Sequence, residues 1–432
     1  MKRKSFYIFT LFIVQSILIF PQGTWENIIS PTNQFLTSVH FADSLYGWAV
    51  GDSGVIIHTT DGGTQWQLQI SNTTDKITDV FFINRNIGWA AAWNVYDFPF
   101  GTVLHKTTDG GQSWISAPYR EEGIFIRCIL FLDSLTGWMG GTPHALVKTT
   151  DGGTIWKQAD IDSTVLAFFP VHNIKFYNEF YGYACGGAFE VAGVIWKTTN
   201  GGKQWVALEP TFAPPDPVHQ IHLFDELNVM GVGGDFEFNG VGIVRTSDGG
   251  NFWDYESIGL AGVAFDLEFR NDNEAWITRG FPGSFIFSSD SGTTWKQTPV
   301  NADATILEIF FLDSLHGFAV GKNGTILKYK PPIINNISTE SRLILKEYVL
   351  LQNYPNPFNP GTVIKYSIPQ DGFVTLDVFN SLGEKVASLV YGMKVAGNYE
   401  INFNASDLAS GIYFYKLQAG SFIETKKMIL IK

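Results

Sequence analysis

The chain has 432 residues, enough for two or three ordinary domains, and it is rich in glycine and aromatic residues while charged residues make up only 16%. This composition is typical of a sheet-rich protein with many tight turns, and it excludes a disordered chain and a coiled coil. The 29 basic and 41 acidic residues give a net charge of −12, so the field of the chain repels a phosphate backbone and excludes nucleic acid as a partner.

The first segment, residues 1–23, is predicted to be a secretory signal peptide. A basic start, "MKRK", precedes the apolar run "SFYIFTLFIVQSILIF". The alternative is a membrane anchor, for which this run is short. No cysteine stands directly after this run, which argues against a lipoprotein anchor. The two cysteines of the chain, Cys128 and Cys185, lie in apolar runs and are expected to be buried thiols, with a disulfide as the alternative.

Residues 24–330 repeat two alternating phrases. The first phrase starts at an aromatic residue, and its copies begin at Phe41, Phe82, Phe131, Phe176, Phe224, Phe269 and Phe311. Successive copies stand 41, 49, 45, 48, 45 and 42 residues apart. A period of about 40–50 residues with several short strands in each unit is the signature of a β-propeller. The sequence therefore predicts an all-β, seven-bladed propeller over these residues.

The strands can be assigned within one unit. In the first unit they are predicted at residues 35–41, 47–51, 54–60 and 66–70, separated by polar and glycine-rich turns. The seventh unit ends at "GKNGTILKYK" and lacks the last strand, whereas "GTWENII" near Trp25 reads as such a strand. We therefore expect the N-terminal segment to pair into the seventh unit and close the ring, which removes two open sheet edges.

The second phrase has the pattern Ser/Thr-x-Asp-x-Gly-x-x-Trp and occurs six times. Its acidic and aromatic members are Asp61 and Trp66, Asp109 and Trp114, Asp151 and Trp156, Asn200 and Trp205, Asp248 and Trp253, and Asp290 and Trp295, with Asn200 replacing the aspartate once. An aspartate in a hairpin turn accepts hydrogen bonds from backbone N–H groups, and a buried tryptophan contributes roughly 4–6 kcal/mol. Six copies spread around a ring do not converge on one substrate, so we interpret the phrase as structural.

This pattern resembles the Asp-box families, which include sialidases, related glycosidases and non-enzymatic propellers. Both phrases together most resemble the photosystem II assembly-factor type of seven-bladed propeller, and that resemblance covers about 300 residues. It implies the fold, whereas an activity does not follow from a fold alone.

A linker is predicted at residues 331–347, and residues 348–432 form a different kind of sequence. Their alternating strands and glycine-containing turns suggest a small Ig-like β-sandwich. This segment resembles the type A C-terminal sorting domain of the type IX secretion system, and the positions that carry the resemblance are Asn356, Pro357, Gly383, Gly411, Tyr413 and Lys427. The resemblance implies the type IX secretion machinery as a partner and export through the periplasm, followed by release or attachment at the outer surface. The alternative is an ordinary adhesive Ig-like module.

Candidate ligand-binding residues fall on one predicted face of the ring. Long loops between the second and third strands vary from unit to unit, and one of them carries Trp93, Tyr96 and Phe98. The inner strands place polar residues three or four positions before the first phrase, near the expected mouth of the central channel: Asp79, Arg127, His172, Asp266 and Glu308. In the fifth unit the same count gives Ile221 and Gln220. The alternatives are that these aromatic rings pack on each other and that the polar groups bind channel water.

Several functions remain open. The first is a secreted or cell-surface propeller without catalytic residues, monomeric, without cofactor or metal, that binds an extracellular protein, peptide or glycan. The second is an extracellular glycoside hydrolase of sialidase-like type, which would use two of the carboxyl groups at 79, 266 and 308 as acid and base. The chain lacks the Arg-Ile-Pro start motif of sialidases, which favours the first. A purely structural role at the surface is the third.

Overall fold

The computed structural model describes residues 23–162, 166–208, 214–237, 239–332, 348–353, 355–369, 372–394, 397–406, 408–420 and 422–431. The predicted signal peptide, apart from its last residue, and most of the predicted linker lie outside these ranges. Contacts divide the chain into two compact units, Met1–Ile333 and Ile334–Lys432. The described part of both units consists of strands joined by turns and three short 3-10 helices, so the all-β prediction is confirmed.

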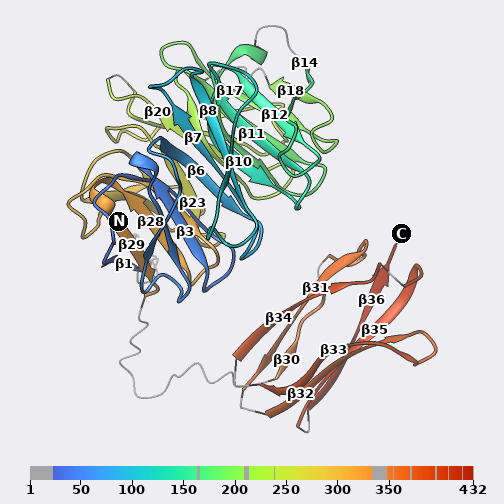
Figure 1. The fold of residues 1–432 in the computed structure, drawn as a ribbon. Coiled ribbons are helices and arrows are strands. Elements are labelled where there is room, and N and C mark those ends of the chain that lie inside the picture. The colour runs from blue at the N-terminus through green and yellow to red at the C-terminus, as the bar shows by residue number, and fades with distance from the viewer. Residues whose placement is uncertain are drawn as a thin grey trace, which may run out of the picture. The chain divides into compact units, whose positions relative to one another are not determined.

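Seven sheets form the described part of the first unit (Figure 1). The first three are β2(Leu36–Phe41), β3(Gly47–Gly51), β4(Ile56–Thr59) and β5(Gln67–Gln69); β6(Lys76–Phe82), β7(Gly88–Asn94), β8(Gly101–Thr107) and β9(Ile115–Pro118); and β10(Phe125–Phe131), β11(Gly137–Thr142), β12(Ala145–Thr149) and β13(Lys157–Gln158). The strands predicted for the first unit are thus present, with shorter ends. The 3-10 turn η1(Asp52–Gly54) replaces the start of the predicted third strand.

The remaining four sheets follow in chain order. They are β15(Val171–Phe176), β16(Gly182–Ala188), β17(Ala192–Thr198) and β18(Trp205–Leu208) with β14(Ile161–Asp162); β19(Val218–Leu223), β20(Val229–Gly234), β21(Val241–Thr246) and β22(Asp254–Ser257); β23(Asp266–Phe269), β24(Ala275–Thr278), β25(Ser284–Ser288) and β26(Lys296–Pro299); and β27(Ile306–Phe311), β28(Gly317–Gly321) and β29(Ile326–Lys330) with β1(Thr24–Ile28). The helical turns η2(Leu166–Phe168) and η3(Lys322–Gly324) lie in loops. The sequence did not predict β14, which pairs parallel to β18.

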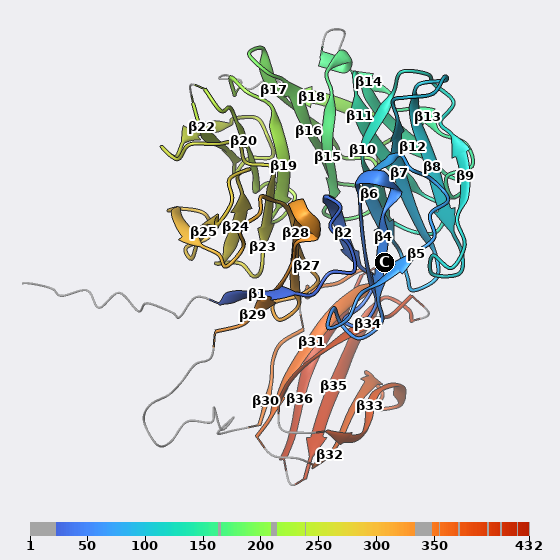
Figure 2. The same ribbon diagram turned by 60° about the vertical axis from the view of Figure 1, so that its left-hand side comes forward.

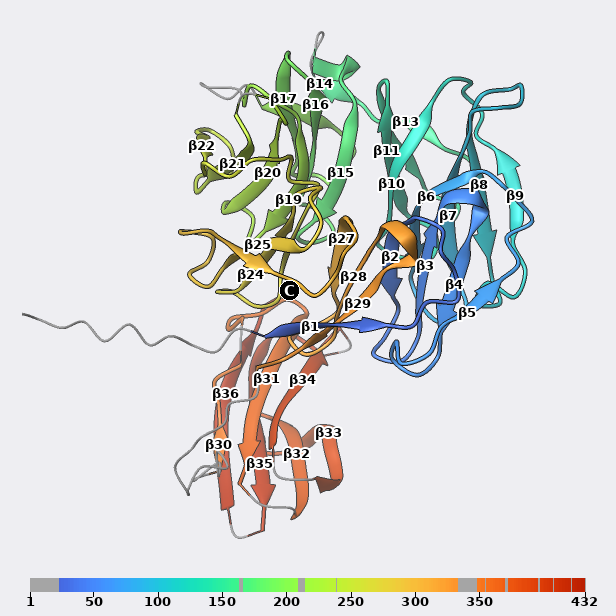
Figure 3. The ribbon, with the colours of Figure 1, turned by 90° about the vertical axis from the view of Figure 1, so that its left-hand side faces the viewer.

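The inner strands of successive sheets contact one another in a closed order. That order runs β2, β6, β10, β15, β19, β23, β27 and back to β2, and in Figure 3 these strands lie toward the middle of the unit. The N-terminal strand β1 pairs antiparallel with β29, with Trp25 opposite Tyr329 (Figure 2). The prediction that the N-terminal segment completes the last sheet is therefore confirmed.

The first repeated phrase builds the turn between the inner strand and the second strand. Asp43 Oδ1 accepts the N–H groups of Leu45 and Tyr46 and so fixes the turn. The ring of Phe41 lies over Gly47, where an added Cβ would come within 2.5 Å of that ring. The spacing of Phe, Asp and Gly in the phrase is therefore a requirement of one tight turn.

Apolar faces of neighbouring sheets pack against each other around the ring. Trp48 of the first sheet stacks on Phe82 of the second, with ring centroids 3.5 Å apart and planes 5° from parallel. Trp89 and Phe131 repeat this arrangement between the second and third sheets at 3.6 Å. Burying such pairs removes large aromatic surfaces from water, so the core of this unit lies between the sheets.

Two sheets form the described part of the second unit. They are β30(Val349–Leu350), β31(Gly361–Ile368) and β34(Gly397–Asn404), and β33(Lys385–Lys394), β32(Gly372–Asn380), β35(Gly411–Ala419) and β36(Phe422–Leu430). One buried cluster joins side chains from both sheets, among them Ile364 of β31, Leu376 of β32 and Tyr415 of β35. The unit is therefore built of two sheets with a shared apolar core.

The motif residues of the second unit lie at three places in this framework. Asn356 donates to the carbonyl of Lys427 and accepts the N–H of Ile429, which ties the motif segment to β36. Tyr413 is buried and donates its hydroxyl to the carbonyl of Ala409. Gly383 has a φ of 82° in the turn between β32 and β33, a conformation that favours glycine.

Candidate functional site

A pocket of about 240 Å³ lies where the inner strands of the first unit meet. Side chains from the inner strands of all seven sheets surround it or contact its walls, and those that line it are Thr37, Thr78, Asp79, Arg127, Cys128, His172, Asn173, His219, Gln220, Phe265, Asp266, Leu307 and Glu308. The five inner-strand residues named from the sequence are among them. We call this pocket the channel mouth.

A β-bulge at the same place in six inner strands explains why two adjacent residues of one strand reach the channel mouth. The register shifts by one residue between Leu36 and Ser38 in β2 and between Ile77 and Asp79 in β6, and it shifts likewise in β10, β15, β19 and β27. A bulge adds one residue without a partner and turns the strand locally. The bulged residue and the one after it then both border the channel.

The bulge in β19 corrects the sequence alignment of the fifth unit. Gln220 pairs with Val232 directly after the bulge, as Asp79 pairs with Ala91 in the second unit. Gln220 therefore occupies the position expected for Ile221, which is fully buried in the core. The residue at the outer position is His219, which the sequence reasoning missed because it aligned Phe224 rather than Leu223 with the other phenylalanines.

The three carboxyl groups of the channel mouth hold neighbouring sheets together. Asp79 Oδ2 accepts the backbone N–H of Ile129 on the next inner strand at 2.7 Å, and Asp266 Oδ2 accepts that of Ile309 at 2.7 Å. Glu308 Oε1 accepts the N–H of Val39 at 3.3 Å, across the place where the last sheet meets the first. Each carboxyl group thus satisfies a backbone donor of its neighbour.

These carboxyl groups have raised pKa values. Burial raises the pKa of Asp79 to about 6, and it also raises the pKa of Asp266. Burial, together with the charges of Asp79 and Asp266, raises the pKa of Glu308 well above its ordinary value. The cluster therefore retains protons at a pH where exposed carboxyl groups have lost theirs.

Below the carboxyl groups, an ion pair crosses the interior of the ring. Lys175 on β15 and Glu268 on β23 approach to 2.6 Å, although the inner strand β19 lies between theirs in the ring order. Burial lowers the pKa of Lys175, but the charge and hydrogen bond of Glu268 outweigh that effect and the net shift is upward. The pair spans the channel beneath the mouth.

Two histidines and one arginine form the other side of the channel mouth. The rings of His172 and His219 stack with centroids 4.7 Å apart and planes 7° from parallel. Burial lowers the pKa of His219 to about 4 and holds that of His172 well below its ordinary value, so both rings are neutral near pH 7. Among the described residues, His172 Nδ1 and His219 Nε2 have no hydrogen-bond partner. The guanidinium of Arg127 lies 5.5 Å from the ring centroid of Trp93.

The aromatic loop residues named from the sequence separate into two kinds. Trp93 is half-buried at the end of β7 and donates its indole N–H to the carbonyl of Ile126 at 2.6 Å, so it supports the wall beside Arg127. Tyr96 and Phe98 are 84% and 77% exposed.

Three further loop phenylalanines reach the channel mouth. Phe189 lies 6.0 Å from His219, and Phe236 lies 6.3 Å from Phe265, in each case between ring centroids. Phe236 also contacts Phe281. All three are exposed on loops between second and third strands, and the variable length of these loops was their signal in the sequence.

The Asp boxes lie in the turns between third and fourth strands, and the hydrogen bonds of their Thr and Asp side chains stay within those turns. Thr59 Oγ1 accepts the N–H of Gly63 and donates to Asp61 Oδ1, which in turn accepts the N–H of Gln65. Asn200 makes the corresponding bonds with Thr198 and Gln204. These bonds lower the pKa of the aspartates, and hydrogen bonds from Ser113 lower that of Asp109 to about 2.

The described residues hold no group of three His, Cys, Asp or Glu side chains arranged to bind a metal ion. They also include no helix with the length and apolar character needed to cross a membrane.

Sheets arranged in a ring, a central channel and repeated Asp-box turns define the class of protein as an Asp-box β-propeller. Comparison with known families gives two matches: residues 20–123 and 229–330 match the Photosynthesis system II assembly factor YCF48 family, and residues 352–432 match the Secretion system C-terminal sorting domain. Both resemblances drawn from the sequence are confirmed.

Individual relatives agree with these matches. The Photosystem II assembly lipoprotein Ycf48 of Nostoc sp. (strain PCC 7120) is 28% identical over 353 residues, which cover 77% of this chain and 96% of the relative. The solved structure of YCF48 bound to D1 peptide has a TM-score of 0.58 at 22% identity, over 72% of this chain and 99% of that one. The GH74 enzyme of Niastella koreensis has a TM-score of 0.55 at 13% identity, over 95% of this chain and 75% of that one. These two structural likenesses show the fold alone.

Proposed function

We propose that the chain is an exported binding protein whose ring holds a segment of an extracellular polypeptide at the channel mouth. In this proposal the seven sheets are the blades of a closed propeller over residues 24–330, and the second unit, residues 348–432, is an Ig-like sandwich. The closed order of inner-strand contacts and the pairing of β1 with β29 support the first part. The buried cluster shared by two sheets supports the second.

Export through the type IX secretion machinery follows from the sorting-domain match. The protein crosses the periplasm behind its signal peptide, and the outer membrane with the help of the second unit. It then acts as a monomer, released or attached at the outer surface.

The observation that carries the binding proposal is the combination of groups at the channel mouth. Exposed Phe189 and Phe236 offer apolar contact at the channel mouth, which the cation of Arg127 also lines. Phenylalanine rings contact apolar side chains, and a guanidinium donates hydrogen bonds to backbone carbonyl groups. A related propeller has been solved with a bound peptide, which favours a polypeptide over a glycan.

Glycoside hydrolysis is the second candidate, and one observation favours it. The pKa of Asp79 is about 6, which suits a general acid, and the fold is shared with a GH74 enzyme. Against it, Asp79, Asp266 and Glu308 all accept backbone N–H groups of the neighbouring sheet. A carboxyl group committed in this way cannot approach a glycosidic oxygen without opening the ring.

A displayed peptide library panned on the mature chain tests the binding proposal. Peptides enriched on the native protein should lose at least about tenfold in affinity for the double variant Phe189→Ser and Phe236→Ser, and for Arg127→Ala. Lys157→Ala is the matched control, because it removes one cation on β13, outside the channel mouth. Enriched peptides that bind all variants equally would place binding elsewhere. Release of reducing sugar from a glycan panel, lost in Asp79→Asn, would instead establish the hydrolase.

A further inference from the structure

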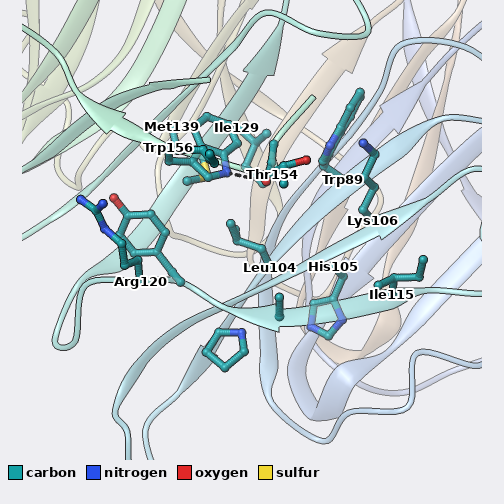
Figure 4. A pocket seen from close by; sticks show the side chains of 15 residues that line it. Trp89, Leu104, His105, Lys106, Ile115, Arg120, Ile129, Met139, Thr154 and Trp156 are labelled. Atoms are coloured by element: carbon teal, nitrogen blue, oxygen red, sulfur yellow. Dashed lines mark hydrogen bonds between the residues drawn. The ribbon is translucent and has the colours of Figure 1, made fainter. Parts of the chain in front are cut away.

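A second pocket, independent of the channel mouth, lies between the outer parts of the second and third sheets. It has a volume of about 450 Å³, and its walls come from β7, β8 and β9 on one side and from β10, β11 and the turn before β13 on the other. Figure 4 shows Leu104 in the middle of this space, with Lys106 and Arg120 on opposite sides of it. We call it the rim groove.

The rim groove exists because one residue of the outer strand is small. Ala117 of β9 pairs with Leu104, as Gln69 of β5 pairs with Ile56 one sheet earlier. The side chain of Gln69 fills the corresponding space and donates to the carbonyl of Gly110 at 2.9 Å. The methyl group of Ala117 cannot reach that far, so the space in front of it stays open.

Several other sheets carry larger residues at this position. In the fifth to seventh sheets these are Glu256, Thr298 and Ile28. The third sheet also has an alanine, Ala159, and it too borders a pocket, but the residues that line that pocket are mostly polar or charged. The groove next to Ala117 therefore differs from its neighbour in the apolar character of its walls.

The walls of the rim groove are mostly apolar, and the indole N–H groups in them already have acceptors. The indole N–H of Trp89 donates to Gly152, and that of Trp156 donates to Gly153, each at 3.1 Å. Ile129 and Met139 complete the apolar wall. A ligand body here gains affinity by removing apolar surface from water and loses none by leaving buried donors unpaired.

The charged residues that line the rim groove are cations, and Arg120 also pairs with the neighbouring Glu121 at 3.4 Å. Lys106 and Arg120 are its charged residues, and no Asp or Glu is among the described residues that line it, although the whole chain carries a net charge of −12. Burial lowers the pKa of His105 to about 4, so that ring adds no charge near pH 7. An apolar space between two cations fits a ligand with an apolar body and an anionic head.

We propose that the rim groove binds a medium-chain alkyl carboxylate. Pockets of roughly 300–1,000 Å³ enclose small organic ligands, and the lower part of this range suits an aliphatic chain of about ten carbons. Lys106 or Arg120 pairs with the carboxylate while the chain lies over Leu104 and Trp156.

Titration of the mature full-length protein with decanoate below its micellar concentration tests this site. Calorimetry and tryptophan fluorescence report binding, because Trp89 and Trp156 line the groove. We expect saturable binding of one decanoate, weaker binding of decanol and none of decyltrimethylammonium. Ala117→Gln should weaken decanoate binding by at least about tenfold, because the longer side chain fills the groove as Gln69 does.

Two further substitutions test whether decanoate binds in the groove itself and through its carboxylate. Ser116→Gln is the matched control on the same strand, since Ser116 is not among the residues that line the groove, and it should leave binding unchanged. Arg120→Gln should weaken decanoate but not decanol. If Ala117→Gln does not melt cooperatively, Ala117→Leu replaces it, because leucine stands at the equivalent position, 208, of the fourth sheet. Decanoate that fails to bind, that binds Ala117→Gln as tightly as the native chain, or that is matched by the cationic amphiphile would overturn the proposal.

Discussion

Glu308 on β27 and Asp79 on β6 are joined through a single hydroxyl group, that of Ser38. Ser38 Oγ lies 2.8 Å from Asp79 Oδ1 and 3.3 Å from Glu308 Oε1. A hydroxyl group has one proton to donate, so the second contact is a hydrogen bond only when one of the carboxyl groups is protonated. The raised pKa values of both groups agree with a retained proton. The meeting point of the first and last sheets is therefore sensitive to pH.

The first prediction concerns stability and pH. The folded-state pKa of Glu308 lies above its ordinary value, so the folded protein holds more protons than the unfolded chain, and stability falls as pH rises from about 4.5 through the folded pKa. Glu308→Gln removes this ionisation and retains an oxygen for the N–H of Val39. We expect the variant to be more stable than the native chain at pH 8, by roughly 1–3 kcal/mol, and equally stable at pH 4.

Urea denaturation at a series of pH values measures this effect. Glu122→Gln serves as the control, because Glu122 is an exposed glutamate in the loop before β10 and its replacement should not change the pH profile. A Glu308→Gln variant that is less stable than the native chain at pH 8 would contradict the prediction.

Closure of the ring depends on Trp25. Its ring is 7% exposed and lies within 5.7 Å, between centroids, of Trp276, Phe285, Phe311 and Tyr329. Trp25→Ala should lower the free energy of unfolding by about 3–5 kcal/mol, because the cavity cannot collapse between four fixed rings. Ile29→Ala, at a position that is 91% exposed, should change it by less than about 0.5 kcal/mol. Equal denaturation midpoints for the two variants would contradict the role of β1.

The Asp-box turns should tolerate asparagine but not alanine. Asp109 accepts the N–H and the hydroxyl of Ser113 and the hydroxyl of Thr107, and Asn200 already makes the backbone bond in its own turn. Asp109→Ala should lower the midpoint of thermal denaturation, whereas Asp109→Asn should lower it by less than half as much. Thermal denaturation of both variants measures the difference. Equal losses would show that the charge, rather than the hydrogen bonds, holds the turn.

Both cysteines should be inert in the folded protein. Cys128 and Cys185 are buried free thiols, and burial raises the pKa of each. Iodoacetamide should modify neither of them at pH 8 in the native protein and both after denaturation, as measured by mass spectrometry. Protection that persists in denaturant until a reductant is added would reveal a disulfide instead.

Much of the fold could be predicted because each repeat contains the residues that its own turns require. The turn at Gly47 and the Asp-box turn at Asp61 need specific residues at specific spacings, and both recur along the chain. The pairing of β1 also could be predicted, since the last unit visibly lacked a strand. The parallel strand β14 could not, because two residues carry no periodic signal and its pairing depends on the neighbouring sheet.

The channel mouth could be predicted only in part. The inner-strand residues at 79, 127, 172, 266 and 308 do come together, since they share one position in the repeat. Their hydrogen bonds could not be foreseen, because Ile129 and Ile309 donate from neighbouring sheets. The offset at Gln220 was missed because the fifth unit has Leu223 where the other units have phenylalanine, so that Phe224 was aligned in its place.

The pairing of Trp25 with Tyr329 brings together residues that are roughly 300 positions apart. Contacts between such distant positions form late, because the entropy of closing so long a loop must be overcome first. During synthesis the ring remains open until its last sheet has emerged. The first strand, β1, therefore has no pairing partner until β29 has been made. A chain cut short before β29 would carry every Asp box and still lack a partner for its first strand.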